Sequence, residues 1–409
     1  MNLKLSKSSI KAQSSISITG SKSESNRLLL LQVLYPTIKI KNISNSDDSK
    51  LMTAALASKD QEIDIHHAGT AMRFLTAYFS TQEGRETILT GSKRMKERPI
   101  KILVEALNQL GADIVYKEKE GFPPLLIKGK TLTKSKVSLN TNVSSQYISA
   151  LLLIASKLEN GLELTLKGKI TSVPYIKMTL DLLKRIDVDS TFIENTITVK
   201  AKKLEIKKTH LTVESDWSSV SYFYSIVALS KIGTTIQLSS YTKSSLQGDS
   251  ILTELYKSFG VSTRFQEHSI ILEKTNTVNP EISIDFDLSK APDIAQTISV
   301  TVFALGLESN LTGLHTLKIK ETDRLVALKT EIEKLGGQVK ITNESLHLSA
   351  SKKINENILI ATYKDHRMAM AFAPLALKVA IEIEDYMVVS KSYPAFWEDL
   401  NSLGIEINK

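Results

Sequence analysis

Arginine is scarce in this sequence and is placed where it could bind anions. Only nine of the 52 Lys and Arg residues are arginines, and the lysines are spread along the whole chain. Six arginines fall in five short polar stretches: Arg27, Arg73, Arg94, Arg98, Arg324 and Arg367. A guanidinium matches phosphate or carboxylate oxygens with two parallel hydrogen bonds, whereas an ammonium acts as a point charge. The distribution therefore predicts sites for bound oxyanions.

Five helical patterns begin with polar or charged residues and continue as apolar helices. They cover residues 20–34, 68–79, 144–158, 320–336 and 365–377. The first turn of a helix presents unpaired N–H groups and the positive end of the helix dipole, so anions bind there. Ordinary capping by Ser, Thr or Asp explains any one of these turns. It does not explain why cations, which the dipole repels, recur there, and we therefore expect anionic ligands between the turns.

Other chemistry is less well supported. The basic stretch GSKRMKERPI at 91–100 has a loop-like sequence and, taken alone, fits a solvated charge run equally well. The chain has no P-loop sequence and no G-x-G-x-x-G after a strand. The absence of cysteine excludes disulfides, thiolate metal sites and a cysteine nucleophile. His66 and His67 would point to opposite sides of a strand, so we expect no metal site. General acids and bases are available from Lys22, Asp293, Glu321 and His366.

The elements that carry these residues recur along the chain. A helical pattern, an apolar residue, a glycine and a strand-like alternation follow one another repeatedly, and glycine in this place is the usual left-handed helix stop. The spacings are 76, 73, 76 and 68 residues, and a weaker copy ends near residues 57–58. Helix–glycine–strand is common in α/β proteins, but the regular spacing favours six repeats of roughly 70 residues, each mixing strands and helices. The stops are Gly111, Asp187 in the glycine position, Gly260, Gly336 and Gly404.

Composition sets the broad class. A chain of 409 residues with 42% hydrophobic residues is long enough for two domains. No apolar run approaches the roughly 18–20 residues that span a bilayer. The Lys- and Ser-rich N-terminus would also fit a transit peptide, but it lacks Arg, and Ile16 and Ile18 alternate with polar residues as in a strand. We therefore expect a cytoplasmic protein.

The net charge of +8 permits nucleic acid, anionic membranes or anionic small molecules as ligands.

Taken together, the polar stretches resemble the signatures of the 5-enolpyruvylshikimate-3-phosphate synthase family, also called 3-phosphoshikimate 1-carboxyvinyltransferases. In order they are GSKSESNR, AGTAMR, RMKERP, SSQY, DWSSVSYF, KETDR, DHRMAM and KSYPAFWEDL, between residues 20 and 400. Each motif alone is modest, but eight in the same order are highly specific.

The resemblance implies a fold. It is an α/β (α+β) protein with the two-domain enolpyruvyl transferase fold, built from six βαβαββ repeat units, three per domain, in an inverse α/β barrel-like arrangement. Residues 1–19 and 215–409 would form the first, discontinuous domain, and residues 20–214 the second. The active site would lie in the inter-domain cleft, and the domains would close around the substrates. Six repeats agree with the count made from the helix stops.

The resemblance also implies an activity. The enolpyruvyl group of phosphoenolpyruvate would move to the 5-hydroxyl of shikimate 3-phosphate, with release of phosphate, in the biosynthesis of chorismate and the aromatic amino acids. No metal or organic cofactor would be needed. The protein would act as a monomer on small molecules, with neither nucleic acid nor a membrane as partner.

The family's site residues carry over to positions of this sequence. Lys22, Asp293 and Glu321 would be catalytic, with Asp293 as the base for the attacking hydroxyl and Glu321 and Lys22 moving protons at the methylene carbon. Phosphoenolpyruvate would be held by Lys22, Gly69, Arg94, Gln146, Arg324, Arg367 and Lys391. Shikimate 3-phosphate would be held by Lys22, Ser23, Arg27, Ser144, Ser145, Gln146, Ser172, Tyr175, Asp293 and Lys320. Thr70, Arg73 and His366 would also lie in the cleft. The chain departs from the family's pattern at His67, Thr316 and Val173.

Two other functions compete with this one. The sister transferase that acts on UDP-N-acetylglucosamine shares the fold and the donor, but it usually carries a loop cysteine, and KETDR with DHRMAM fits the shikimate branch better. A non-catalytic nucleic-acid-binding protein would be expected to interleave aromatic residues with cations. Aromatic residues make up only 6% of this chain, and its arginines lie at helix starts.

Overall fold

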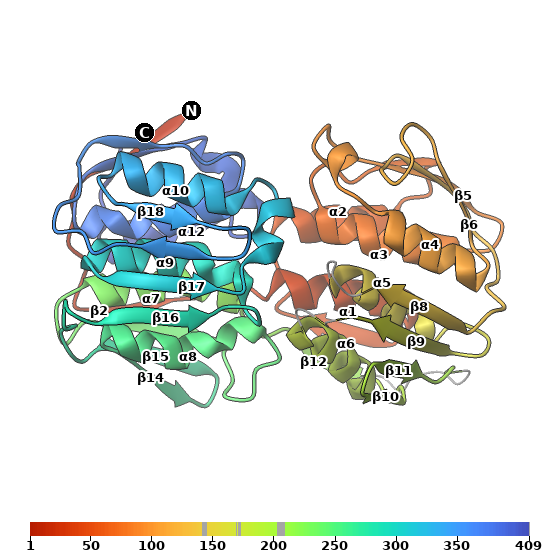
Figure 1. Ribbon diagram of the computed structural model, residues 1–409. Helices are drawn as coiled ribbons and strands as arrows, with labels where there is room; N and C mark the ends of the chain where they lie inside the picture. The colour runs from red at the N-terminus through yellow and green to blue at the C-terminus, as the bar shows by residue number, and fades with distance from the viewer. Residues whose placement is uncertain (141–144, 169, 171–172, 203–208, 409) are drawn as a thin grey trace. The chain divides into compact units, whose positions relative to one another are not determined.

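The computed structural model describes residues 1–409 except 141–144, 169, 171–172, 203–208 and 409. The chain folds into two compact units (Figure 1), which we call unit 1 (residues 1–19 and 214–409) and unit 2 (residues 20–213). Glu214 belongs to unit 1 because its carboxylate accepts hydrogen bonds from Trp217 and Ser245. The second crossover between the units therefore lies between Val213 and Glu214, one residue before the boundary at 214–215 that was expected from the sequence.

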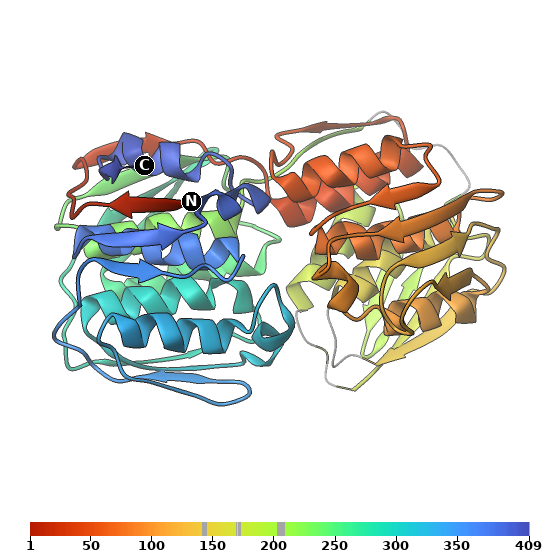
Figure 2. The same cartoon turned by 90° about the horizontal axis from the view of Figure 1, so that it is seen from above.

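Unit 1 contains three four-stranded sheets, each with one parallel pair at an edge and two antiparallel pairs. In sheet order the first consists of β20 (Ile358–Ile360), β21 (Ile381–Glu384), β1 (Asn2–Leu5) and β22 (Ile407–Asn408). The second is β14 (Val261–Gln266), β15 (Ser269–Lys274), β13 (Thr235–Ser239) and β2 (Gln13–Ile16). The third is β16 (Ser283–Asp287), β17 (Glu308–Thr312), β19 (Leu346–Leu348) and β18 (Val339–Ile341). Figure 2 shows the first strand, in red, beside the blue C-terminal strands, so both chain ends complete one sheet.

Unit 2 contains two four-stranded sheets of the same kind and one two-stranded sheet. In sheet order the first complete sheet is β4 (Glu62–Asp64), β5 (Glu86–Thr90), β7 (Leu125–Lys128) and β6 (Asp113–Tyr116). The second is β8 (Lys136–Asn140), β9 (Leu162–Lys167), β11 (Thr196–Val199) and β10 (Ser190–Ile193). In the third sheet, among the residues that the structure describes, β12 (Thr209–Thr212) pairs with β3 (Ile38–Lys41) alone, in parallel. The expectation of six complete βαβαββ repeats is thus wrong for one repeat. Only residues 58–61 lie between its second helix and β4, too few for the final hairpin.

Helices connect the strands within each repeat. Unit 2 has α1 (Lys22–Leu34), α2 (Asp47–Ala57), α3 (Gly69–Ser80), α4 (Lys101–Leu110), α5 (Ser145–Ala155) and α6 (Val173–Arg185). Unit 1 has α7 (Trp217–Leu229), α8 (Leu252–Leu255), α9 (Ala295–Leu305), α10 (Arg324–Lys334), α11 (His366–Phe372) and α12 (Phe396–Leu403). Short 3₁₀ helices are η1 (Met95–Glu97), η2 (Gly248–Ile251), η3 (Tyr256–Phe259), η4 (Pro292–Ile294), η5 (His315–Ile319), η6 (Ala373–Leu377) and η7 (Tyr386–Lys391). Within the described ranges, no helix is long and apolar enough to cross a membrane.

The helix stops predicted from the sequence are confirmed. The backbone φ angle is positive at every one of them: 105° at Gly111, 55° at Asp187, 70° at Gly260, 97° at Gly336 and 113° at Gly404. This left-handed conformation ends a helix and costs glycine no steric strain. Asp187 adopts it as well, and aspartate tolerates it better than most side chains.

Some helices are buried on every side and form the centre of a unit. All residues of α3 and nearly all residues of α7 and α9 are buried. Their polar residues are mainly Ser and Thr, whose hydroxyls can bond to the helix's own backbone. The Thr301 hydroxyl donates to the carbonyl of Thr297 at 2.7 Å, and the hydroxyls of Ser221 and Thr297 join α7 to α9 at 2.9 Å. Such helices suit an interior position because they expose no charged face.

Gly20 shows how tightly unit 2 packs at its first residue. A methyl group at this position would lie 1.9 Å from the carbonyl oxygen of Asn42 and 2.7 Å from Cγ1 of Val213. The side-chain amide of Asn42 in turn donates to the carbonyl of Val213 at 2.9 Å. The first and last segments of unit 2 are therefore held together at a place where only glycine fits.

We expect Gly20→Ala to lower the free energy of unfolding by about 1–3 kcal/mol, the usual cost of overpacking an interior. The backbone oxygen of Asn42 cannot move aside as a flexible side chain could. Urea titration followed by circular dichroism measures the change. Ser17→Ala, an exposed position nearby, should change stability by less than about 0.5 kcal/mol. Equal stability of Gly20→Ala and the wild type would contradict the packing described for Gly20.

Candidate active site

In unit 1 the N-terminal ends of four helices meet through their side chains. Arg324, the first residue of α10, donates from Nη1 to Asp293 of η4, which leads into α9, at 3.1 Å. Arg324 Nε donates to Asp365, the N-cap of α11, at 2.7 Å. From the first turn of α11, Arg367 donates to the Ser218 hydroxyl in the first turn of α7 at 3.3 Å. These contacts gather the positive helix ends in one place, as the sequence predicted for α10 and α11.

Arg324 is the centre of this group. Its side chain is almost fully buried, with 1% of the residue exposed. Besides Asp293 and Asp365, it donates from Nη2 to Glu321 at 2.9 Å. Burial alone would lower the pKa of the guanidinium, but Asp365, Glu321 and Asp293 hold it above its ordinary value. Three carboxylates thus keep a charged group in a place where an isolated charge would be very unfavourable.

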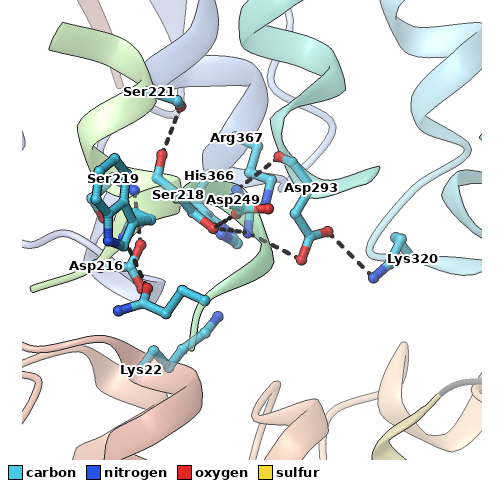
Figure 3. Close-up of polar contacts among 12 residues, drawn as sticks. Lys22, Asp216, Ser218, Ser219, Ser221, Asp249, Asp293, Lys320, His366 and Arg367 are labelled. Atoms are coloured by element: carbon cyan, nitrogen blue, oxygen red, sulfur yellow. Dashed lines mark hydrogen bonds and ion pairs between the residues drawn. The ribbon is translucent and has the colours of Figure 1, made fainter. Parts of the chain in front are cut away.

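Asp293 connects Arg324 to two further cations. Its Oδ1 lies 3.3 Å from Lys320 Nζ, and its Oδ2 lies 3.4 Å from Arg367 Nη2. Arg367 also donates to the backbone carbonyl of Asp293 at 2.9 Å. Figure 3 shows the Asp293 side chain between Lys320 and Arg367. We call Asp293, Lys320, Glu321, Arg324, Asp365 and Arg367 the Arg324 cluster.

Helix α10 begins later than its sequence pattern predicts. Residues 320–336 were expected to be helical, but α10 begins at Arg324, and the Asp323 carboxylate caps it by accepting from Leu325 N and Val326 N. Lys320 and Glu321 therefore lie in the loop after η5, outside the first turn of the helix. They still reach the Arg324 cluster through their side chains. The last pattern was also read as one helix, but it changes to the 3₁₀ helix η6 after Phe372.

Two other predicted residues lie beside α11. His366 is buried, and its Nδ1 lies 3.7 Å from Oδ1 of Asp365. Lys391 at the end of η7 donates to the carbonyl of Lys364, directly before Asp365, at 2.7 Å. Both therefore lie close to the Arg324 cluster.

In unit 2 side chains also link five helices, and four of these helices are contacted in their first turns. Lys22 of α1 lies 3.6 Å from the carboxylate of Asp48 in the first turn of α2. Gln146 of α5 donates to the hydroxyl of Thr70 in the first turn of α3 at 3.2 Å. The remaining link is Arg27, which joins α1 to α5 and α6. The residues predicted from GSKSESNR, AGTAMR and SSQY are thus brought together.

Arg27 is buried and its donors contact protein oxygens. Nε donates to Thr179 of α6 at 2.8 Å, Nη2 to Ser149 of α5 at 2.9 Å, and Nη1 to the carbonyl of Ser23 at 2.7 Å. The guanidinium carbon also lies 5.8 Å from the ring centre of Tyr175. Burial lowers the pKa of Arg27 to about 10. Arg27 therefore fixes three helices relative to one another, and its direct contact with a substrate stays a prediction.

Arg73 and Gly69 lie at the start of α3. Arg73 donates to the carbonyl of Gly69 at 3.1 Å and to the carbonyl of Pro99 at 3.0 Å. A methyl group at Gly69 would lie 2.5 Å from Nη1 of Arg98. The basic stretch at 91–100 is thus no isolated surface loop, because Pro99 and Arg98 contact the first turn of α3.

The remaining residues predicted for the site are Arg94 and three serines, Ser144, Ser145 and Ser172. Arg94 is exposed, and its Nη1 lies 3.1 Å from Glu97. Ser145 is buried at the start of α5, while Ser144 and Ser172 lie outside the described residues.

The expectation that His66 and His67 point apart is wrong. His66 has a φ of 50°, and the Nδ1 atoms of the two rings lie 3.1 Å apart.

The acidic partners of the predicted cations are not among the site residues expected from the sequence. Asp365 belongs to the DHRMAM motif and binds Arg324, but the motif predicted no role for it. Asp48, the partner of Lys22, was not singled out. The usable signal was an acid at the start of a helix, as in DHR at 365–367 and SDD at 46–48. Arg98 was noted as basic but not assigned to the site.

The fold and these sites define a class of protein. Both units are α/β structures in which helix N-termini converge and collect guanidinium, ammonium and hydroxyl groups. Such an arrangement suits small ligands that carry phosphate or carboxylate groups.

Comparisons with known proteins identify the family. The family model for EPSP synthase (3-phosphoshikimate 1-carboxyvinyltransferase) matches residues 56–400. A 3-phosphoshikimate 1-carboxyvinyltransferase of Bacteroides fragilis is 46% identical over 404 residues, covering 98% of this chain and 97% of the relative. One from Mannheimia succiniciproducens is 36% identical over 428 residues, covering 96% of each. The fold matches a solved EPSP synthase of Acinetobacter baumannii over the whole of both chains, with a TM-score of 0.79 and 20% identity. The chain belongs to the EPSP synthase family.

Proposed function

We propose that this protein transfers the enolpyruvyl group of phosphoenolpyruvate to the 5-hydroxyl of shikimate 3-phosphate and releases phosphate. The observation that carries the proposal is the near full-length identity to 3-phosphoshikimate 1-carboxyvinyltransferases. The reaction belongs to the synthesis of chorismate and the aromatic amino acids. The sites described above suit both substrates, because each substrate carries a phosphate and a carboxylate.

The reaction needs a base for the hydroxyl and an acid for the methylene carbon. Asp293 is our candidate for the base, since its carboxylate is fixed by Lys320 and Arg367 as well as by Arg324. As the hydroxyl oxygen bonds to C2 of phosphoenolpyruvate, its proton passes to Asp293. Glu321 or Lys22 delivers a proton to C3.

The tetrahedral intermediate then collapses. The bond from C2 to the phosphate oxygen breaks, and phosphate leaves with the proton that Asp293 took up. C3 returns its proton to the group that delivered it, Glu321 or Lys22, and the double bond is restored. No metal or organic cofactor is needed, because these steps move protons and one leaving group, which positioning and fixed charge can assist.

The binding residues named from the sequence stay part of this proposal. Arg367, Lys391 and Arg94 would contact phosphoenolpyruvate, together with Lys22, Gly69, Gln146 and Arg324. Arg324 is almost fully buried, and its hydrogen bonds go to carboxylates. It would therefore act mainly by holding Asp293 and Glu321 in place. Shikimate 3-phosphate would contact Ser23, Arg27, Ser144, Ser145, Ser172, Tyr175 and Lys320, besides Lys22, Gln146 and Asp293.

We further propose that the protein works as a cytoplasmic monomer on small molecules alone. Two points support the proposal: the proposed substrates are small, soluble metabolites, and the site residues named above all come from one chain. Neither nucleic acid nor a membrane takes part in the reaction as proposed.

The activity is tested by phosphate release. The purified protein should release phosphate only when phosphoenolpyruvate and shikimate 3-phosphate are both present, and a metal chelator should leave the rate unchanged. Each substrate is omitted in turn as a control. A requirement for UDP-N-acetylglucosamine in place of shikimate 3-phosphate would assign the chain to the sister transferase and overturn the proposal.

Glu321→Gln should lower kcat by at least about a hundredfold, the usual scale for a lost acid or base. Shikimate 3-phosphate should still bind, which isothermal calorimetry can measure. Glu333→Gln is the matched control, because Glu333 is an exposed glutamate on α10 that pairs only with Lys329 at 3.6 Å among the described residues. If Glu321→Gln instead keeps its turnover and binds substrate weakly, Glu321 serves only to hold Arg324.

A further inference from the structure

One buried carboxyl beside the Arg324 cluster has no part in the chemistry proposed so far. Asp249 lies in η2, which packs against α7 and α8, and 4% of the residue is exposed. Its Oδ2 accepts a hydrogen bond from the hydroxyl of Ser218. An interior carboxyl is rare unless it is paired or protonated, so its position needs an explanation.

Ser218 connects Asp249 to the reaction site. The Ser218 hydroxyl accepts from Arg367 Nη2 at 3.3 Å, and the same Nη2 lies 3.4 Å from Oδ2 of Asp293. Figure 3 shows the line from Asp249 through Ser218 and Arg367 to Asp293. Because a hydroxyl has one proton, donating it to Asp249 leaves a lone pair of Ser218 directed at Arg367. Asp249 therefore determines which way Ser218 faces.

The charges around Asp249 come from four elements. Asp293 of η4 and Asp216, the N-cap of α7, are like charges, and Arg367 of α11 is the nearby cation. On the adjoining α8, Glu254 is exposed and pairs with Lys257. Burial, followed by Asp293, raises the pKa of Asp249 to about 7, against the opposing effect of Arg367 and the Ser218 hydrogen bond.

We propose, resting on the function above, that Asp249 is a positioning residue of this enzyme: it orients Arg367 through Ser218 and takes up a proton when an anion binds to Arg367. The physical reason is the charge of Arg367, which is the main attraction that favours the ionised form of Asp249. A phosphate or carboxylate on Arg367 cancels this attraction, while the repulsion from Asp293 and Asp216 remains. The carboxyl then binds a proton more readily.

Linkage gives the sign of the pH effect. Protonated Asp249 is neutral, so it does not weaken the attraction between Arg367 and the bound anion. Ionised Asp249 does weaken this attraction, because its negative charge offsets part of the charge of Arg367 and repels the anion. Affinity for phosphoenolpyruvate should therefore fall as the pH rises through about 7, where Asp249 loses its proton in the free protein. If the bound anion raises the pKa by about one unit, the loss approaches tenfold.

The first experiment measures kcat/KM for phosphoenolpyruvate between pH 6 and 9 at saturating shikimate 3-phosphate. Asp249→Asn keeps an acceptor for Ser218 but is always neutral. Relative to this variant, the wild type should lose about tenfold in kcat/KM as the pH rises, mainly through KM. Asp399→Asn is the matched control, because Asp399 of α12 pairs with Tyr393 outside the site and also has a raised pKa. It should follow the wild-type profile.

A second variant separates the two parts of the proposal. Ser218→Ala removes the link to Arg367 but leaves the carboxyl of Asp249, so it should raise KM at every pH and keep the pH dependence. Coincident profiles of the wild type and Asp249→Asn in an active enzyme would overturn the inference.

The proton on Asp249 can also be tested without turnover. Because its pKa is raised in the folded protein, the stability that its carboxyl contributes is fully present below the unfolded pKa of about 4 and lost as the pH rises through about 7. The Tm of Asp249→Asn relative to the wild type should therefore rise between pH 5 and pH 8. If it rises while phosphate release is absent, the proposed function fails and the protonation of Asp249 stands. A Tm difference that is the same at both pH values would overturn the protonation.

Discussion

The ion pair between Arg324 and Asp365 is the interaction on which the unit 1 site depends. Both side chains are almost completely buried, and their residues are 41 positions apart in the sequence. Removing two charges from water costs several kcal/mol per ion, and only close, well-formed hydrogen bonds offset that cost. Once Arg324 is held in this way, Asp293 and Glu321 have fixed places, because each bonds to another atom of the same guanidinium. A structural interaction thus defines the positions of the proposed catalytic groups.

The two units stabilise the cations near their helix N-termini in different ways. Converging helix N-termini repel cations, yet both units place arginines there. In unit 1 the charge is balanced by carboxylates, three of which surround Arg324, while Asp293 also pairs with Arg367. In unit 2, Arg27 and Arg73 contact hydroxyl and carbonyl oxygens, which stabilise the cations without cancelling their charge. The two arginines of unit 2 therefore keep their positive charge for a ligand, whereas Lys22 of the same unit lies beside the Asp48 carboxylate, as the cations of unit 1 lie beside theirs.

The sequence predicted those features that are encoded locally. Gly111 and Asp187 mark helix ends because the left-handed turn needs one residue of the right type. The clustering of arginines at the starts of helices was also visible, because capping residues and cations are a few positions apart. The resemblance to the family added the reaction and the connection between motifs distant in sequence.

The buried carboxyl of Asp249 and the boundaries of two elements could not be predicted in the same way. Asp249 is remote in sequence from Arg367, and no local pattern distinguishes it from the exposed acids of the chain. Lys320 and Glu321 were placed on a helix because their spacing from Arg324 is helical, but the cap at Asp323 starts the helix later. The missing hairpin of one repeat follows from the short segment at 58–61, which the repeat count alone did not reveal.

A double-mutant cycle on Arg324 and Asp365 tests most directly whether this pair holds the site together. The free energy of unfolding and kcat/KM would be measured for the wild type, Arg324→Gln, Asp365→Asn and the double variant. We expect each single change to cost about 3–5 kcal/mol of stability, because each leaves a buried partner uncompensated. The double variant should cost less than the sum by about 1–3 kcal/mol, with a matching non-additivity in kcat/KM. Additive losses in both quantities would contradict the account, since the two residues would then act independently.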